Sequence, residues 1–220
     1  MPEPARKLRI TEIFYSLQGE PTTVGLPTVF IRLTGCPLRC KYCDTEYAFQ
    51  GGEWWHFDKV IAEVKKYNTH YITLTGGEPL AQKASIALLK QLSDLGYKVS
   101  LETSGALDIQ AIDPRVMKVM DLKTPSSGEE SKNKYSNLDF ITEHDQIKFV
   151  ICNRKDYDWA VNILGQYKLT EKCEVLFSPV NSGENTSIQK DLANWILADQ
   201  LTVRFQIQLH KIIWGNIQGV

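Results

Sequence analysis

The sequence predicts an α/β fold, an incomplete TIM-like barrel of about six parallel βα units that forms a single domain over residues 1–220. Short apolar segments typical of buried strands alternate with amphipathic segments typical of helices, which is the pattern of a mainly parallel sheet. The units are fewer than the eight of a closed barrel. A length of 220 residues, of which 43% are hydrophobic, suits one domain with a sizeable core.

The expected strands are runs of apolar or alternating residues bounded by turn residues. Because the carboxyl ends of parallel strands meet at one edge of a sheet, polar residues that follow these strands are candidates for a site. The strands are expected at Thr28–Thr34, Tyr71–Thr75, Lys98–Thr103, Val116–Leu122, Gln146–Ile151, Glu174–Phe177 and Val203–Leu209.

Helices are expected between these strands, where apolar residues recur at helical spacing. Asp58 is a plausible N-cap of the first helix, and Gly96 is a plausible stop after the second. The polar segment Thr124–Asn137 is expected to be a solvated loop, with a mobile lid over a site as the alternative. The helices are expected at Phe57–Tyr67, Lys83–Leu95, Asp156–Tyr167 and Ile188–Leu197.

Charge and composition argue against a nucleic-acid-binding, membrane or secreted disulfide-rich protein. A net charge of −1 and a pI near 6.4 predict no broad attraction to nucleic acid or to an anionic membrane. Residues 1–10 contain no apolar run of signal-peptide length, and no segment reaches ~18 consecutive apolar residues, so a cytoplasmic location is expected. The five cysteines do not suggest a disulfide framework, and Cys152 and Cys173 are expected to be buried reduced thiols.

Three cysteines lie close together in the segment GCPLRCKYCDTEY. Cys36, Cys40 and Cys43 have the spacing C-x3-C-x2-C, which can hold three irons of a [4Fe–4S] cluster and leave the fourth iron open to a ligand. The alternative is a zinc loop with His56 as the fourth ligand, although zinc cysteines usually come as two separated pairs.

Polar motifs follow three of the expected strands: TGGEP at residues 75–79, ETSG at 102–105 and DLK at 121–123. The glycines of the first motif allow the backbone to approach a ligand closely. Polar groups at carboxyl strand ends are typical of α/β binding sites. The alternative for each motif is a tight turn or a cap of the following segment.

Together, these motifs resemble those of the radical S-adenosylmethionine (SAM) superfamily. Cys36, Cys40 and Cys43 match its cluster motif, and Tyr42 occupies the aromatic position before the third cysteine. The resemblance implies a [4Fe–4S] cluster, SAM and the partial-barrel fold of that superfamily. The residues that it implies for SAM binding are Gly76, Gly77, Glu78, Glu102, Ser104 and Lys123, with Ser178 and Pro179 near the adenine.

Further segments narrow the resemblance to the 7-carboxy-7-deazaguanine synthase family. They are LQGE, FIRLTGCPLRCKYCDT, LTGGEP, ETSG, DLKTP and QLHKIIWG, which extend over nearly the whole chain. The resemblance implies that Thr45 helps to hold Mg²⁺ and that Arg32 pairs with a substrate carboxylate. The other residues that it implies for substrate binding are Leu17, Gln18, Gly19, Thr75, Gln208 and His210, with Lys211 beside them.

The resemblance also implies an activity and partners. The expected enzyme is a carbon–nitrogen lyase that contracts the ring of 6-carboxy-5,6,7,8-tetrahydropterin to 7-carboxy-7-deazaguanine with loss of ammonia, in queuosine and 7-deazapurine biosynthesis. A homodimer and an electron donor such as flavodoxin are expected. Two alternatives stay open: another radical SAM enzyme such as a glycyl-radical activase, and a non-catalytic metal-binding module.

Overall fold

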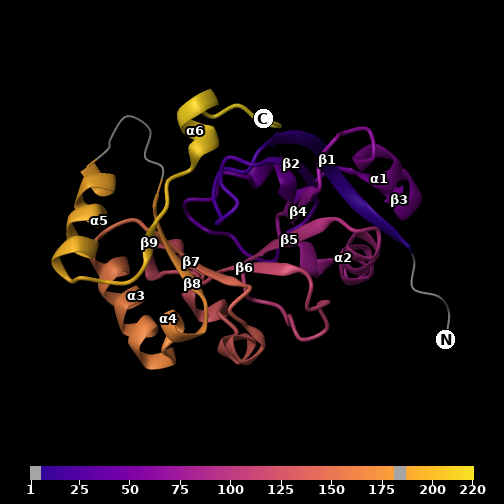
Figure 1. Cartoon of the computed structure of the whole chain (residues 1–220). Helices are drawn as coiled ribbons and strands as arrows, with labels where there is room; N and C mark the ends of the chain where they lie inside the picture. The colour runs from indigo at the N-terminus through magenta and orange to yellow at the C-terminus, as the bar shows by residue number, and fades with distance from the viewer. Residues whose placement is uncertain (1–5, 181–186) are drawn as a thin grey trace.

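A computed structural model of the chain describes residues 6–180 and 187–220 (Figure 1). Within these residues the strands form one nine-stranded sheet in the order β3-β1-β2-β4-β5-β6-β7-β8-β9. Their bounds are β1 Lys7–Leu17, β2 Pro27–Leu33, β3 Glu53–His56, β4 Tyr71–Gly76, β5 Lys98–Thr103, β6 Met117–Asp121, β7 Gln146–Ile151, β8 Glu174–Pro179 and β9 Arg204–Phe205.

The parallel part of the sheet runs from β2 to β9 through six parallel pairings. β1 pairs antiparallel with β2, and β3 pairs antiparallel with β1 at the edge. The predicted α/β fold with about six parallel units is confirmed. The antiparallel pair β1 and β3 extends it in a way that the sequence patterns did not predict.

Helices cover the two ends of the sheet. Figure 1 shows α1 and α2 beside the first strands and α3, α4 and α5 beside the last ones. In the described residues, the connections from β5 to β6 and from β6 to β7 contain no α-helix. The helices are α1 Phe57–Val64, α2 Ser85–Asp94, α3 Arg154–Tyr167, α4 Leu169–Lys172, α5 Ser187–Ala198 and α6 Leu209–Trp214; the 3₁₀ helices are η1 Glu46–Phe49, η2 Pro79–Ala81, η3 Pro125–Ser127, η4 Glu130–Lys132 and η5 Tyr135–Phe140.

Several predicted boundaries need correction. His56, not Asp58, occupies the N-cap position of α1, and Asp58 lies in the first helical turn. The expected strand at 203–209 is only two residues long, Arg204–Phe205, and α6 starts at Leu209. Gly96 follows α2 with a φ of 87°, which confirms it as the stop.

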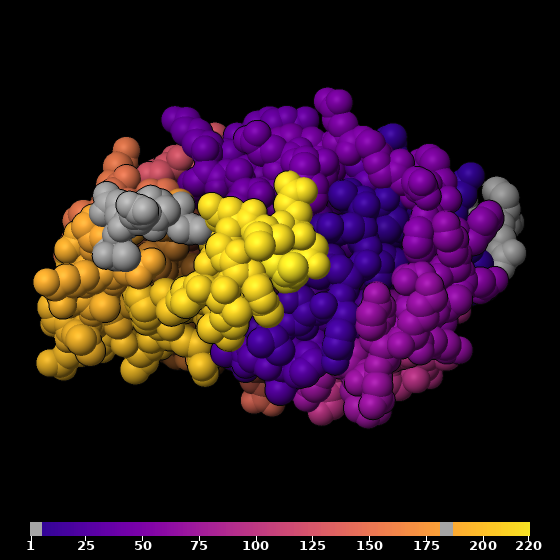
Figure 2. All heavy atoms as spheres, turned by 90° about the horizontal axis from the view of Figure 1, so that it is seen from above, coloured from indigo at the N-terminus to yellow at the C-terminus, as the bar shows by residue number. Residues whose placement is uncertain are grey.

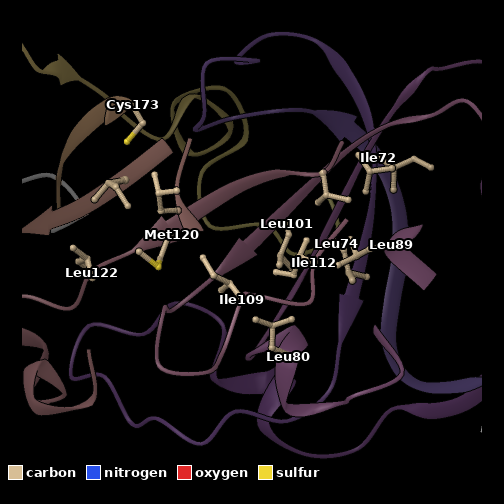
Figure 3. Close-up of a cluster of buried hydrophobic side chains, with 14 of the residues drawn as sticks. Ile72, Leu74, Leu80, Leu89, Leu101, Ile109, Ile112, Met120, Leu122 and Cys173 are labelled. Carbon is tan, nitrogen blue, oxygen red and sulfur yellow. The ribbon is translucent and has the colours of Figure 1, made fainter. Parts of the chain in front are cut away.

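The hydrophobic core lies between the sheet and its helices. Figure 3 shows Ile72 and Leu74 of β4, Leu101 of β5 and Met120 of β6 in one cluster with Leu89 of α2. Each fully buried side chain of this size stabilises the fold by about 1.5–3 kcal/mol. This packing holds the parallel strands together, and with them the strand ends that carry the site.

The two cysteines outside the cluster motif differ from each other. Cys173 lies in the core, as predicted, and its burial raises the pKa of the thiol to about 12. Cys152 is only half-buried, so the prediction of a buried thiol is wrong for it. Its pKa is also raised to about 12, by burial and by the Asp156 carboxylate.

The described part of the chain has no helix with both the length and the apolar character of a bilayer-crossing segment.

Candidate active site

A cavity of ≈650 Å³ opens at the carboxyl ends of the parallel strands. Its floor includes Thr75 and Gly76 at the end of β4 and Ser104 just after β5. Its wall includes the loop that follows β2 and carries the three cysteines. Apart from Glu78, every residue that the sequence predicted for the site lines this cavity.

The three cysteines of the motif are free, half-exposed and directed to the same cavity. Burial raises the pKa of each thiol, and the neighbouring thiol Cys43 contributes at Cys36 and Cys40. Among the described residues, no three His, Cys, Asp or Glu side chains are grouped so that they could hold a single metal ion. A cubane needs only one thiolate for each of three irons, so this donor set fits a [4Fe–4S] cluster.

The zinc alternative loses its proposed fourth ligand. His56 pairs with Lys7 between β3 and β1 and does not line the cavity. Between the last cluster cysteine and α1, the chain forms η1 and β3.

The cluster loop, residues 35–43, is fixed against the start of the TGGEP turn. The Glu78 amide donates to the Gly35 carbonyl at 2.8 Å, and the Gly77 amide donates to the Leu33 carbonyl at 3.2 Å. A Cβ atom at Gly77 would lie 2.4 Å from the Gly35 oxygen and 2.8 Å from the Cys36 Cβ. Glycine at 77 is therefore required by the close approach of the two loops.

The Glu78 side chain is directed into the protein and does not line the cavity. It is 0% exposed, and its carboxylate accepts hydrogen bonds from the Leu80 amide, the Thr103 hydroxyl and both the amide and hydroxyl of Ser104. The carboxylate is therefore engaged inside the protein, and a contact between Glu78 and SAM would have to come from the Glu78 backbone. Its role is to hold the end of β5 and Ser104 at the cavity floor.

Partly buried charged residues lie at the end of β6 and on β7. Lys123 Nζ lies 3.0 Å from Asp121 Oδ2, and Lys148 Nζ lies 2.6 Å from Glu20 Oε2. Burial opposes both ammonium charges, but Asp121 raises the pKa of Lys123 and Glu20 raises that of Lys148. Asp121 Oδ1 is buried without a hydrogen-bond partner among the described residues, which leaves an acceptor for a ligand at the cavity.

Gln18, Thr75 and Glu102 form a second polar group near Glu20. Gln18 accepts from the amides of Gly19 at 2.7 Å and Glu20 at 3.2 Å, and its Nε2 lies 3.5 Å from Glu102 Oε1. Thr75 donates to the other Glu102 oxygen at 2.9 Å. Burial and the Glu20 charge raise the pKa of Glu102. Glu102, expected beside SAM, therefore lies with the residues expected to bind substrate.

Arg32 is held in a fixed orientation on β2. Its Nε donates to Glu12 Oε1 at 2.7 Å, and its guanidinium lies 5.5 Å from the Phe14 ring and 5.7 Å from the Tyr47 ring. The Tyr47 hydroxyl donates to the same Glu12 oxygen at 2.8 Å, and burial raises the Tyr47 pKa to about 12. This arrangement leaves the two Nη groups for a carboxylate in the cavity, which is the geometry that suits arginine.

The C-terminal segment, residues 208–220, forms one side of the cavity. Figure 2 shows the C-terminal residues, in yellow, as a compact group of atoms against the N-terminal residues, in indigo. The Leu209 amide donates to the Gly19 carbonyl at 3.0 Å, and a Cβ at Gly19 would lie 2.1 Å from His210 Nδ1. Burial lowers the pKa of His210. Residues 215–220 complete this wall.

Asp44 links the C-terminal segment to the cluster loop. It accepts hydrogen bonds from Lys211 and, at 3.3 Å, from Gln208. Burial opposes its charge, but Lys211, Thr45 and Gln208 together hold the Asp44 pKa well below its usual range. Thr45 Oγ1 donates to Asp44 Oδ1 at 2.9 Å, which places the predicted Mg²⁺ residue beside a carboxylate.

Several lining residues were not selected from the sequence. Glu20, Asp44 and Asp121 stand inside the motifs that drew attention, so proximity to those motifs was an available signal. Lys148 could have been found as the only charge in the apolar run QIKFVI. Tyr47 is the last residue of the quoted cysteine segment GCPLRCKYCDTEY, so the same signal was available for it.

Comparison with known proteins identifies the family of the chain. Residues 30–125 match the model of the radical SAM superfamily. A protein of Koribacter versatilis named 7-carboxy-7-deazaguanine synthase is 42% identical, with 94% of this chain and 97% of that protein covered. The protein of the same name from Chlorobaculum tepidum is 40% identical, with 97% of each chain covered. The chain belongs to the 7-carboxy-7-deazaguanine synthase family.

Membership in this family confirms the resemblance seen in the motifs. As a radical SAM enzyme, the chain uses a [4Fe–4S] cluster and SAM, and the alternative of a non-catalytic metal-binding module is set aside. The crystal structure of QueE from Escherichia coli shares the fold, with a TM-score of 0.76 at 22% identity over 93% of this chain and 95% of that one.

Proposed function

We propose that the chain converts 6-carboxy-5,6,7,8-tetrahydropterin to 7-carboxy-7-deazaguanine with loss of ammonia, a step of 7-deazapurine and queuosine biosynthesis. The observation that carries the proposal is the union, in one cavity, of the three cluster thiols with the oriented guanidinium of Arg32. The names of the relatives give the product, and the family resemblance supplies the substrate and the loss of ammonia. A single domain, as expected from the sequence, is part of this proposal.

Cys36, Cys40 and Cys43 would hold the cluster. When bound, the cluster and SAM supply a 5′-deoxyadenosyl radical that takes a hydrogen atom from the substrate and later returns it. The protein contributes orientation and a cavity shielded from water, since the radical chemistry belongs to the cofactors.

SAM would lie against the strand ends next to the cluster loop. Gly76 and Gly77 offer backbone groups there, and Ser104 is held in place by Glu78. Lys123 and the free oxygen of Asp121 offer a cation and an acceptor at the end of β6. Ser178 and Pro179 line the cavity at the end of β8, where the adenine would pack.

The substrate would occupy the side lined by β1, β2 and the C-terminal segment. Arg32 would bind its carboxylate, because its Nη groups remain available. Glu102 would contact the heterocycle from below, since it lies between Gln18 and Thr75. The remaining contacts are assigned to Leu17, Gly19, Gln208 and His210, which line this part of the cavity.

Mg²⁺ would bind at Thr45. The ion prefers oxygen ligands and keeps positions open for substrate oxygens. The Thr45 hydroxyl and the adjacent Asp44 carboxylate supply such oxygens at the cavity wall. An ion here would act as a template and as a Lewis acid toward the substrate.

An electron donor, a homodimer and a cytoplasmic location are also part of the proposal. A one-electron donor such as flavodoxin would reduce the cluster, and a homodimer is proposed from the family resemblance. A cytoplasmic location suits three cysteines that must stay reduced to bind iron.

The test is an anaerobic assay of the reconstituted protein with SAM, Mg²⁺, a strong reductant and 6-carboxytetrahydropterin, read by mass spectrometry. Formation of 7-carboxy-7-deazaguanine, lost in Cys40→Ala, is the expected result. If the wild-type protein produced only 5′-deoxyadenosine and methionine, the proposed substrate would be wrong. Activity toward a protein that acquires a glycyl radical would favour the activase alternative instead.

A further inference from the structure

Within the polar segment Thr124–Asn137, residues 124–134 are fixed to their neighbours. We call residues 124–134 the brace. The side chain of Thr124 donates to the Val150 carbonyl at 2.8 Å, and Ser127 Oγ donates to the Thr124 carbonyl at 2.6 Å. On the outer side, the Trp159 indole of α3 donates to Glu130 at 2.8 Å. A segment with these bonds is anchored to β7 and α3, which is not the condition of a mobile lid.

One part of the brace holds the cluster loop on both sides of Cys40. The Arg39 amide donates to Glu129 Oε1 at 2.6 Å, and the Lys41 amide donates to the Ser127 carbonyl at 3.0 Å. The first bond has a carboxylate acceptor, so it is among the stronger backbone contacts in proteins. The two bonds fix the backbone immediately before and after the central thiol of the motif.

Another part of the brace holds the end of β6. Asn133 accepts from the Lys123 amide at 2.8 Å and donates to the Lys123 carbonyl at 2.9 Å. The next residue, Lys134, donates its amide to the Gly105 carbonyl at 3.2 Å. The brace therefore contacts the two strand ends, after β5 and β6, that carry the proposed SAM residues.

The Glu129 carboxylate is itself placed by the brace. Its own amide donates to Ser127 Oγ at 3.0 Å, and the Lys132 amide donates to its carbonyl at 2.9 Å. Gly128, with a φ of 77°, turns the chain between Ser127 and Glu129. The hydrogen bonds of this turn thus hold the Glu129 carboxylate beside the Arg39 amide.

We propose that the brace sets the distance between the cluster loop and the SAM-binding strand ends, and that Glu129 is the positioning residue that holds Cys40 in register. The inference deepens the proposed function but depends only on its cluster and SAM, not on the pterin. Glu129 does not line the cavity, so it acts through the Arg39 amide rather than on a ligand.

The first experiment measures hydrogen–deuterium exchange in the chain without its cluster. Glu129→Ala should speed exchange of the Arg39 amide on the order of 10-fold, because its acceptor is lost. Glu129→Gln keeps an oxygen acceptor and should restore most of the protection. Glu143→Ala, an exposed position outside the brace, is the matched control. Unchanged Arg39 exchange in Glu129→Ala would overturn the inference.

The second experiment uses the reconstituted protein and SAM without pterin. Glu129→Ala should raise the KM for SAM in reductive cleavage about 10-fold, with a smaller change in kcat, and should alter the electron paramagnetic resonance signal of the SAM-bound cluster. Glu129→Gln should resemble the wild-type protein in both readouts. A wild-type KM and signal in Glu129→Ala would refute the positioning role.

A third variant covers the other end of the brace and guards against a folding failure of Glu129→Ala. Asn133→Ala removes both bonds to Lys123 and should also raise the KM for SAM, while leaving Arg39 exchange slower than in Glu129→Ala. A wild-type KM for SAM in Asn133→Ala would contradict the inference. Because no assay here contains pterin, a wrong substrate in the proposed function would leave these outcomes unaffected.

Discussion

Gly77→Ala is expected to displace the cluster loop. The new Cβ would lie 2.4 Å from the Gly35 oxygen, 2.7 Å from the Gly35 carbonyl carbon and 2.8 Å from the Cys36 Cβ. Non-bonded heavy atoms prefer separations of about 3.5–4.0 Å, so relief requires a movement on the order of 1 Å. Two of these three atoms belong to the backbone and cannot rotate away.

The surrounding bonds make that movement costly. The Glu78 amide is bonded to the Gly35 carbonyl at 2.8 Å, so the two loops cannot separate without breaking this contact. Overpacking of this kind costs about 1–3 kcal/mol, with the lost hydrogen bond in addition. Since Cys36 follows Gly35 directly, the strain acts on the first cluster thiol.

The assay compares iron and sulfide content after anaerobic reconstitution, together with the free energy of unfolding in urea. Gly77→Ala should bind less iron and unfold more easily than the wild-type protein. Gly165→Ala is the control, because a Cβ there meets nothing within 4 Å on helix α3. It should keep full iron content and gain about 0.5–1 kcal/mol of stability. Full iron content and wild-type stability in Gly77→Ala would refute the steric argument.

Three further outcomes are expected. Arg32→Lys should raise the KM for 6-carboxytetrahydropterin about 10- to 100-fold in steady-state assays, because it loses the planar two-bond contact to a carboxylate; an unchanged KM would remove Arg32 from that role. Burial lowers the pKa of His210, so below pH ~6.5 the unfolded chain binds this proton more readily than the folded chain. Stability in urea should therefore fall as the pH drops below about 6.5, and His210→Asn should reduce this loss; an equal loss in the variant would count against the assignment. Lys118→Met should lower the free energy of unfolding in urea by about 3–5 kcal/mol, because the Asp145 carboxylate, 0% exposed and 2.9 Å from Lys118 Nζ, loses its cation. The double variant Lys118→Met with Asp145→Asn should recover part of this lost stability. An unchanged free energy of unfolding in Lys118→Met would contradict the reasoning.

The local features of the site could be predicted from the sequence. The spacing of Cys36, Cys40 and Cys43 and the glycines of TGGEP are properties of short segments, and they keep their meaning wherever those segments lie. The strand patterns also placed Ser104 and Lys123 correctly at one edge of the sheet. This followed because parallel strands bring their carboxyl ends together without further information.

Other features needed the tertiary structure because they depend on contacts between distant segments. Strand β1 alternates between exposed and buried residues only over Lys7–Ile10, and its register with β2 shifts between Ile10 and Glu12. The Glu78 side chain, taken as a ligand of SAM from its motif, is used by Thr103 and Ser104, which lie 25 and 26 residues away. A motif cannot show whether its own side chain is already satisfied.

The sequence by itself determined the chemistry: three thiolates for a cluster, glycines for a close approach, and an arginine for a carboxylate. Only the tertiary structure decided how these groups are oriented. Glu12 fixes Arg32, Gly19 receives His210 from the far end of the chain, and the brace secures Cys40. The physical reason is that residue type and spacing are local, whereas orientation comes from hydrogen bonds and packing that form only when remote segments meet.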